Sequence, residues 1–267
     1  MKLDQELKGR AIRKIDHSHL FADHRYHLIF THNTTHSLKI IAESIQWNQQ
    51  AGHFCFLRQS HSSIIGMRDY VRNDRVHGLD VEELESRSSM KSSLNEDFSN
   101  FNVFVFPAQC NFTGQHFPLR WITDVKNGCL ADIVENDFPW IVVVDAAAYF
   151  MNSTLSLKEY QADFIAFSFY KMFGFPTGVG ALCASRDALE LLKRPYSGGG
   201  TFDSIAWDAP WKVLKPAPAM YEDGTLPFLE IMAIDHGFNF IDSIGGWQAV
   251  QSHVFGLAKM AKQGFYS

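Results

Sequence analysis

Two residues of opposite chemistry stand at the ends of apolar runs in this sequence. Asp145 directly follows the β-branched run 141–144, and Lys171 lies between the apolar run 164–169 and a glycine-rich turn at 174–178. A lysine amine can act as a nucleophile toward a carbonyl carbon, whereas a buried carboxylate needs a cation or several hydrogen-bond donors. Each residue also has a simpler interpretation. Lys171 could keep its ammonium group in solvent, and Asp145 could be purely structural.

Polar residues also follow three other apolar runs. Thr34 and Thr35 come just after the run 26–31, where a segment with helical spacing begins. A helix N-terminus offers free N–H groups and a positive dipole end to a phosphate. His61 and Asn111 follow the runs 53–57 and 103–106. Taken singly, the threonines could be a plain N-cap, His61 could be structural or solvated, and Asn111 could be a turn former.

Together these residues supply what pyridoxal phosphate (PLP) requires of a protein. The two threonines would hold its phosphate, and His61 would lie flat over its ring. Asp145 would pair with the protonated ring nitrogen, and Lys171 would form an imine with the aldehyde. The carboxylate keeps the ring cationic, so that the ring can take up the electrons of a neighbouring carbanion. The sequence therefore predicts a PLP site with Lys171 as the point of attachment.

These residues must be brought together by alternating strands and helices. Strands are predicted at 26–31, 53–57, 103–106, 141–144, 164–169 and 179–183. Helices are predicted from Thr35, after the capping-box sequence at 80–83, at 187–193 and at 229–241. This alternation indicates an α/β fold with a mostly parallel sheet and helices on both faces. Ligands bind such sheets beyond the carboxyl ends of the strands. Asp145 and Lys171, 26 positions apart, then end two successive parallel strands joined by one crossover.

The composition of the 267 residues is that of an ordinary globular domain, with 46% hydrophobic residues, 20% charged residues and a formal net charge of -5. This charge gives no reason to expect a nucleic-acid partner. The N-terminal residues lack the apolar core of a signal peptide, and the apolar run 140–144 is far too short to span a membrane. The four scattered cysteines argue against disulfides and a metal site, and they are typical of a cytoplasmic protein.

Several motifs resemble those of the class-V aminotransferase superfamily, the NifS-like enzymes. They are Val144-Asp145-Ala146-Ala147, residues 168–182, and Ser197-Gly198-Gly199-Gly200-Thr201. Within the superfamily, the segments 106–114, 168–182 and 222–228 are similar to the N-terminal PLP domain of the molybdenum cofactor sulfurases. The resemblance runs from about residue 26 to residue 241. It implies a fold-type-I PLP-dependent transferase.

The resemblance also implies a role for each candidate residue. The expected cofactor-binding residues are Thr34, Thr35, His61, Asn111, Asp145, Ser168, Tyr170, Lys171 and Thr201. Ser168 and Tyr170 would assist the threonines at the phosphate, and Asn111 would lie near the ring hydroxyl. Thr201 would reach a phosphate, often across a dimer interface. Lys171 would be the catalytic residue, because it would both form the imine and carry protons.

The family takes sulfur from L-cysteine, holds it as an enzyme persulfide and passes it to the molybdenum cofactor. That transfer activates xanthine dehydrogenase and aldehyde oxidase. The resemblance therefore implies a PLP-dependent sulfurtransferase, in a homodimer, with L-cysteine and the molybdenum cofactor as substrates. Two alternatives stay open at this point. One is a cysteine desulfurase or another class-V PLP enzyme, and the other is a PLP-binding fragment without turnover.

The same resemblance divides the chain into three parts. An N-terminal helical segment is expected at 1–25, a PLP-binding large domain at 26–241, and the start of a small domain at 242–267. Relatives extend further in both directions, so the chain is expected to be truncated at both termini. Their persulfide cysteine falls in the missing part, and nothing marks Cys110 as the sulfur carrier. Ala148 stands where relatives often have a polar residue, so one contact to the cofactor ring is expected to be missing.

Overall fold

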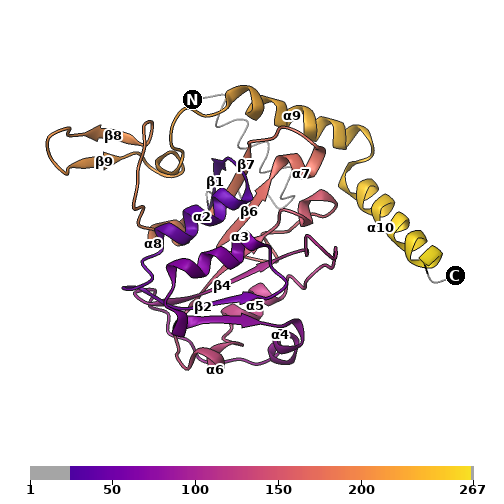
Figure 1. Ribbon diagram of the computed structural model, residues 1–267, viewed down its shortest axis with the longest axis horizontal. Coiled ribbons are helices and arrows are strands. Elements are labelled where there is room, and N and C mark those ends of the chain that lie inside the picture. The colour runs from indigo at the N-terminus through magenta and orange to yellow at the C-terminus, as the bar shows by residue number, and fades with distance from the viewer. Residues whose placement is uncertain (1–24, 266–267) are drawn as a thin grey trace.

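The computed structural model describes residues 25–265. The N-terminal helical segment predicted at 1–25 lies outside the described residues, apart from Arg25. The described chain has a central sheet with helices packed on both sides (Figure 1). This arrangement confirms the predicted α/β fold.

A seven-stranded sheet with the order β1-β7-β6-β5-β4-β2-β3 runs through the centre of the molecule. Its strands are β1 (Tyr26–Thr31), β2 (Ala51–Leu57), β3 (Val76–Leu79), β4 (Phe101–Pro107), β5 (Trp140–Asp145), β6 (Phe164–Ser168) and β7 (Gly180–Ser185). Four neighbouring pairs, from β3 through β6, are parallel, whereas β7 is antiparallel to both β1 and β6. β1 therefore runs in the same direction as β6, so the carboxyl ends of all strands except β7 lie at one edge.

The apolar runs form buried strands because their side chains alternate between two cores, one on each face of the sheet. In β5, Ile141 and Val143 pack into one core, and Val142 and Val144 pack into the other. All four side chains are at most 2% exposed. A strand buried on both faces in this way presents its next polar residue, Asp145, at the carboxyl edge.

Helices cover both faces of the sheet, as predicted (Figure 1). The core that contains Ile141 and Val143 is covered by α2 (Thr34–Ser44), α3 (Ser62–Ile65) and α8 (Arg186–Leu191). The opposite core is covered by α4 (Val81–Arg87), α5 (Trp121–Lys126), α6 (Ala131–Val134), α7 (Phe169–Phe173) and α9 (Phe228–Ser243). Short 3-10 helices are found at Gly66–Tyr70, Asn73–Arg75, Tyr149–Met151 and Ala219–Tyr221.

Most predicted elements are confirmed, with ends that move by one or a few residues. α2 begins at Thr34, one residue earlier than predicted, and the capping box at Asp80 precedes α4 as expected. The predicted strand 164–169 ends at Ser168, because Phe169 begins α7. Several elements were not predicted from the sequence, namely β3, the short helices α3, α5, α6 and α7, the hairpin of β8 (Phe202–Ile205) and β9 (Lys212–Leu214), and α10 (Gly246–Phe265).

The β8–β9 hairpin and α10 extend away from the body of the molecule on opposite sides (Figure 1). The hairpin has its own two-stranded antiparallel pairing, separate from the central sheet. Its connecting segment carries Trp207, which is 95% exposed. Of the helices between residues 25 and 265, none combines the length and the apolarity that a bilayer crossing requires.

Candidate functional site

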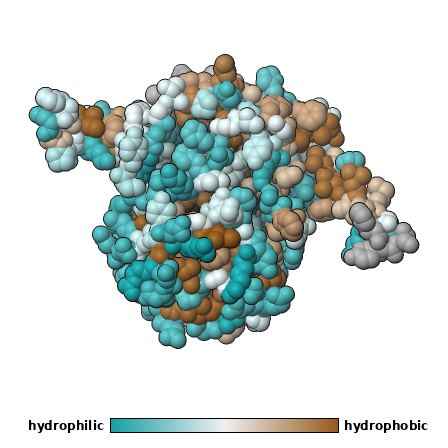
Figure 2. Space-filling view, in the orientation of Figure 1, coloured by the Kyte–Doolittle hydropathy of each residue, from teal (hydrophilic) through white to brown (hydrophobic). Residues whose placement is uncertain are grey.

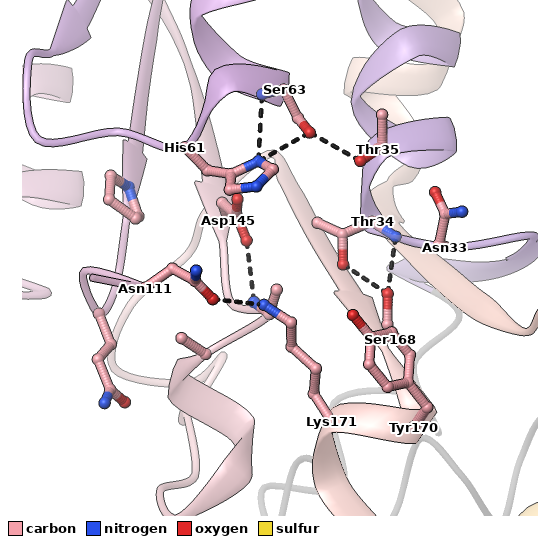
Figure 3. Close-up of a pocket in the computed structure, with 14 residues that line it drawn as sticks. Asn33, Thr34, Thr35, His61, Ser63, Asn111, Asp145, Ser168, Tyr170 and Lys171 are labelled. Carbon is pink, nitrogen blue, oxygen red and sulfur yellow. Dashed lines mark hydrogen bonds between the residues drawn. The ribbon is translucent and has the colours of Figure 1, made fainter. Parts of the chain in front are cut away.

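A cavity of about 180 Å³ lies at the carboxyl edge of the sheet. Figure 3 shows that its lining is largely polar and comes from several elements. Eight of the nine predicted cofactor-binding residues line it, namely Thr34, Thr35, His61, Asn111, Asp145, Ser168, Tyr170 and Lys171. The sheet topology explains this gathering, because each of these residues lies at or after the carboxyl end of β1, β2, β4, β5 or β6.

Lys171 reaches the cavity from α7, the short helix that starts directly after β6. Its Nζ donates a 2.7 Å hydrogen bond to Oδ1 of Asn111, which follows β4 (Figure 3). Lys171 is half-buried. A neutral amide oxygen thus holds the amine at the cavity, where a carbonyl carbon of a ligand could meet it.

Asp145 is the last residue of β5 and is 6% exposed. Its Oδ1 accepts a 2.9 Å hydrogen bond from the backbone N–H of Ala147. Burial raises the pKa of the Asp145 carboxyl, and the Ala147 N–H and the nearby side chains of Lys171 and His61 offset this only in part. Because burial disfavours its negative charge, this carboxylate favours the binding of a ligand that places a cationic group beside it.

The N-terminus of α2 forms a polar cradle at the other end of the cavity. Asn33 is the N-cap, and its side chain accepts a hydrogen bond from the N–H of His36. The N–H of Thr34 donates to Oγ of Ser168 at 2.8 Å, and the two hydroxyl oxygens lie 2.7 Å apart. The plain N-cap interpretation of the threonines is therefore wrong, since Asn33 has that role. Thr34 instead links the helix N-terminus to the end of β6.

The cradle lies close to β7, and a glycine makes this possible. A Cβ on Gly180 would lie 2.7 Å from Cα of Asn33 and 2.7 Å from the carbonyl oxygen of Phe167. Both contacts are with backbone, which cannot rotate away. The residue type at position 180 therefore allows the turn before α2 to approach the sheet.

His61 stands at the N-terminus of α3, so its side chain reaches the cavity from a different helix than the α2 cradle (Figure 3). Its Nδ1 accepts a hydrogen bond from the N–H of Ser63 at 3.2 Å and lies 2.9 Å from Oγ of the same serine. That Oγ lies 2.7 Å from Oγ1 of Thr35. The imidazole is thus held by a chain of hydroxyl groups that ends on α2.

Three further expectations concern Tyr170, Ala148 and Thr201. Tyr170 lines the cavity and is 40% exposed. Ala148 also lines it and presents only a methyl group, as its residue type requires. Thr201 is placed elsewhere: it is fully buried, its hydroxyl donates a 2.6 Å hydrogen bond to the carbonyl oxygen of Gly198, and it does not line the cavity. Within this chain, Thr201 therefore does not join the other eight residues.

The sequence analysis did not assign three polar residues that line the cavity, Asn33, Ser63 and Gln109. Each stands within two positions of an assigned residue. Asn33 precedes a predicted helix and is a favoured N-cap type, so its position could have been found from the sequence. Ser63 and Gln109 have no comparable local signal, because only the fold shows which of several neighbouring polar residues face the cavity.

The residues present fit PLP by the chemistry of their groups. The buried carboxylate of Asp145 calls for a cation such as a protonated ring nitrogen. The N-terminus of α2 with its hydroxyl groups suits a phosphate, and the amine of Lys171 suits an aldehyde. These groups lie around one cavity. A ligand with an anion, a ring cation and a carbonyl carbon would satisfy all of them.

Metal ligation and thiol chemistry have little support in residues 25–265. No group of three or more metal-ligating side chains comes together in this part of the chain. The four cysteines, Cys55, Cys110, Cys129 and Cys183, are free and buried. Burial raises the pKa of the Cys55 thiol, and it raises that of Cys129 to about 12. Because the thiolate is the reactive form, these two residues are poor nucleophiles.

Comparison with known proteins agrees with this geometry. The family model for aminotransferase class-V matches residues 10–267. The chain is 39% identical over 259 residues to the molybdenum cofactor sulfurase of Homo sapiens, and 37% identical over 245 residues to that of Danio rerio. These alignments cover 92% and 88% of this chain but only 29% and 30% of the relatives.

A solved structure shares the fold. The crystal structure of a cysteine desulfurase from Escherichia coli has a TM-score of 0.68 to this chain, at 18% sequence identity. The match covers 90% of this chain and 58% of that protein. At this level of identity the similarity concerns the fold alone.

Proposed function

The chain belongs to the aminotransferase class-V family, and from this premise we propose that it is the PLP-binding domain of a molybdenum cofactor sulfurase. The proposed activity is the removal of sulfur from L-cysteine and its transfer, through an enzyme persulfide, to the molybdenum cofactor. The chain spans about 30% of the length of the sulfurases that it matches. The whole activity therefore belongs to a longer assembly of domains than the residues described here.

One observation supports this proposal more than any other. The amine of Lys171, the buried carboxylate of Asp145 and the Thr34–Ser168 cradle line a single cavity at the carboxyl edge of the sheet. A structural lysine or a structural aspartate, taken alone, would not need the other two. Their combination is what a phosphate-bearing aldehyde with a cationic ring requires.

The roles of the residues follow from their positions. Thr34 and Ser168 would hold the phosphate, and Asp145 would keep the proton on the ring nitrogen. Tyr170 lines the cavity and would assist at the phosphate together with the backbone N–H of Thr35 in the first turn of α2, and Asn111 would lie near the ring hydroxyl. When bound, PLP supplies a cationic conjugated ring that takes up the electron pair of a neighbouring carbon.

Lys171 and His61 would carry the proton chemistry. The amine of Lys171 would hold the cofactor through its aldehyde carbon and would accept the proton from the substrate Cα. Asn111 orients this amine through the 2.7 Å hydrogen bond. The imidazole of His61 would cover the ring face and shield it from water. The sulfur would pass to a thiolate that we place outside residues 25–265, because the four cysteines described there are buried and none of them lines the cavity.

The substrates and partners of the proposed protein follow those of the family. They are L-cysteine as sulfur donor, the molybdenum cofactor as acceptor, and xanthine dehydrogenase and aldehyde oxidase as the enzymes that depend on it. We also propose a homodimer in the cytoplasm, in which Thr201 acts at the partner's phosphate. The division into a segment at 1–25, a large domain at 26–241 and the start of a small domain at 242–267 belongs to the same proposal.

The attachment of the cofactor is tested by spectroscopy. The chain is incubated with PLP, freed of excess cofactor and examined for a visible absorption band, and borohydride reduction followed by peptide mapping locates the modified residue. We expect modification at Lys171, and loss of the band in Lys171→Ala. Lys158→Ala, which removes an exposed lysine, should behave as wild type. A band of full strength in Lys171→Ala would refute the assignment of the site.

The reaction is tested by following sulfur from L-cysteine. The wild-type chain with PLP is assayed for sulfane sulfur, then for sulfuration of aldehyde oxidase and, in parallel, for iron–sulfur cluster assembly. Sulfuration of aldehyde oxidase supports the proposal. Support of cluster assembly alone would replace it with a cysteine desulfurase. Cofactor binding without any sulfur release, even when the flanking domains are present, would indicate a protein that binds PLP without turnover.

A further inference from the structure

We propose that Ser63 is a positioning residue that holds His61 as the tautomer with its proton on Nε2, and that the same contacts commit the hydroxyl proton of Thr35. The inference concerns the three side chains on the α3 side of the cavity, His61, Ser63 and Thr35 (Figure 3). Their hydrogen bonds depend only on this chain. The consequence for the cofactor rests on the proposed function.

The first step is the state of Nδ1 of His61. The backbone N–H of Ser63 points at this nitrogen, with a donor–acceptor distance of 3.2 Å. A backbone N–H can only donate, so Nδ1 must accept and carries no proton of its own. A neutral imidazole has one protonated nitrogen. The proton of His61 therefore lies on Nε2, and the interaction that decides this is the side-chain cap of α3.

The second step identifies the donor and the acceptor in each hydrogen bond between the hydroxyl groups. Oγ of Ser63 lies 2.9 Å from Nδ1, and because Nδ1 has no proton, the serine must be the donor. Its single proton is then used, so Oγ of Ser63 can only accept from Oγ1 of Thr35, 2.7 Å away. Thr35 donates in turn. The chain from Thr35 through Ser63 to His61 leaves no hydroxyl proton for a ligand.

The pair on the other side of the cradle differs in this respect. Thr34 and Ser168 lie 2.7 Å apart and share one hydrogen bond between their hydroxyl groups, whichever of them is the donor. Two hydroxyl groups carry two protons, so one proton remains for a ligand. An anion at the N-terminus of α2 would therefore receive a hydroxyl donor from the Thr34–Ser168 pair and none from Thr35.

Two functional consequences follow. Neutral His61 presents an N–H at Nε2, so it can donate a hydrogen bond to a bound substrate but has no lone pair at that nitrogen to accept a proton. Proton abstraction then falls to the amine of Lys171. The phosphate, in turn, depends on the hydroxyl groups of the Thr34–Ser168 pair much more than on that of Thr35, although all three residues line the cavity.

The tautomer is tested on the chain without cofactor, by nitrogen-15 NMR of the histidine rings, with His61 assigned from the spectrum of His61→Asn. We expect a single tautomer protonated at Nε2. Ser63→Pro, which removes the backbone N–H that points at Nδ1, should allow a measurable population protonated at Nδ1, whereas Ser63→Ala keeps this N–H and should keep the wild-type tautomer. Ser62→Pro is the matched control, because Ser62 is the exposed neighbour at the first position of α3, where proline is tolerated. Proton density on Nδ1 in the wild type, or an unchanged tautomer in Ser63→Pro, would overturn the proposal.

The proton count is tested by titration with PLP and with pyridoxal, which lacks the phosphate. The double variant Thr34→Val with Ser168→Ala, which removes both hydroxyl groups of the pair, should weaken the binding of PLP by about tenfold or more, as expected for one hydrogen bond to a charged group, and should leave the binding of pyridoxal unchanged. Thr35→Val should change neither by more than about twofold. Equal losses in the two variants would overturn the count. If wild-type protein binds no PLP at all, the proposed function fails, whereas the tautomer stands or falls on the NMR result.

Discussion

At the scale of single residues, the buried carboxylate of Asp145 destabilises the folded protein when no cationic group lies beside it. Its folded pKa is raised by burial, so the unfolded chain releases this proton more readily than the folded one. The unfavourable contribution is absent below the ordinary carboxyl pKa of about 3.9. It grows as the pH rises from this ordinary value to the folded pKa and is complete above the folded pKa. A protonated ring nitrogen beside the carboxylate would remove it.

Asp145→Asn should therefore stabilise the chain without cofactor and weaken its binding of PLP. The asparagine oxygen can still accept from the N–H of Ala147, but it carries no buried charge. We expect a gain on the order of 1 kcal/mol at neutral pH, which vanishes as the pH falls below the ordinary carboxyl value. Urea denaturation of both proteins across this pH range measures it. A variant that is less stable at neutral pH, or that binds PLP as the wild type does, would argue against a cation beside Asp145.

At the scale of elements, the position of Lys171 depends on how α7 packs. This helix follows β6 without a loop, and its rings contact α9, with Phe173 and Phe238 at 5.3 Å between centroids in an edge-on arrangement. Gly237 of α9 faces the same ring, since a Cβ there would lie 2.8 Å from Cγ of Phe173. The ring is also confined by Phe169 and Phe175. α9, which is far from α7 in the sequence, thus holds α7 and its Lys171 against the sheet.

Gly237→Ala should disturb the site even though it lies outside the cavity. In an exposed helix this change would stabilise the protein, by up to about 1 kcal/mol. Here the added methyl group should push the ring of Phe173 and cost about 1–3 kcal/mol, with weaker attachment of PLP at Lys171. Gly256→Ala in α10, where nothing lies within 4 Å of the added Cβ, is the control and should be neutral or stabilising. Thermal melts and the visible band follow both effects. Equal behaviour of the two variants would show that α9 does not position α7.

At the scale of the whole molecule, apolar side chains remain on the surface away from the sheet. Trp207 and Ile205 of the hairpin region are 95% and 58% exposed, and Leu229 at the start of α9 is 73% exposed. Figure 2 shows apolar residues gathered along the side that carries α9 and α10. Exposed apolar surface of this kind is typical of protein interfaces. Thr201, directly before β8, does not reach the cavity of its own chain.

These features lead us to expect a dimer in the cofactor-bound state. The exposed apolar residues would then be covered, and Thr201 would serve the partner's phosphate after a rearrangement of the turn 198–201 that releases its hydroxyl from Gly198. Sedimentation velocity at several concentrations, with PLP absorbance as a second signal, measures the mass of the species that carries the cofactor. A monomer with full PLP occupancy would contradict both the dimer and the role given to Thr201.

Much of this architecture could be predicted from local sequence. The run before Asp145 is β-branched and uninterrupted, which is typical of a strand buried on both faces, and it forms β5. The spacing from Asp145 to Lys171 matches two adjacent parallel strands, and β5 and β6 are such a pair. β3 and the β8–β9 hairpin escaped prediction because they are short, and the hairpin residues are mostly exposed. Such strands lack the apolar pattern that marks a buried one.

The sequence by itself determined the strand ends, and with them the set of polar residues available at the carboxyl edge, because a buried strand must change to polar residues where it leaves the core. Only the tertiary structure decided which of these residues meet. It made Asn33 rather than a threonine the cap of α2, joined Ser63 to His61 and Thr35, and kept Thr201 away from the cavity. The physical reason is that a hydrogen bond depends on distances of a few ångströms between segments far apart in the chain. Residue type and spacing do not specify such distances until the helices have packed on the sheet.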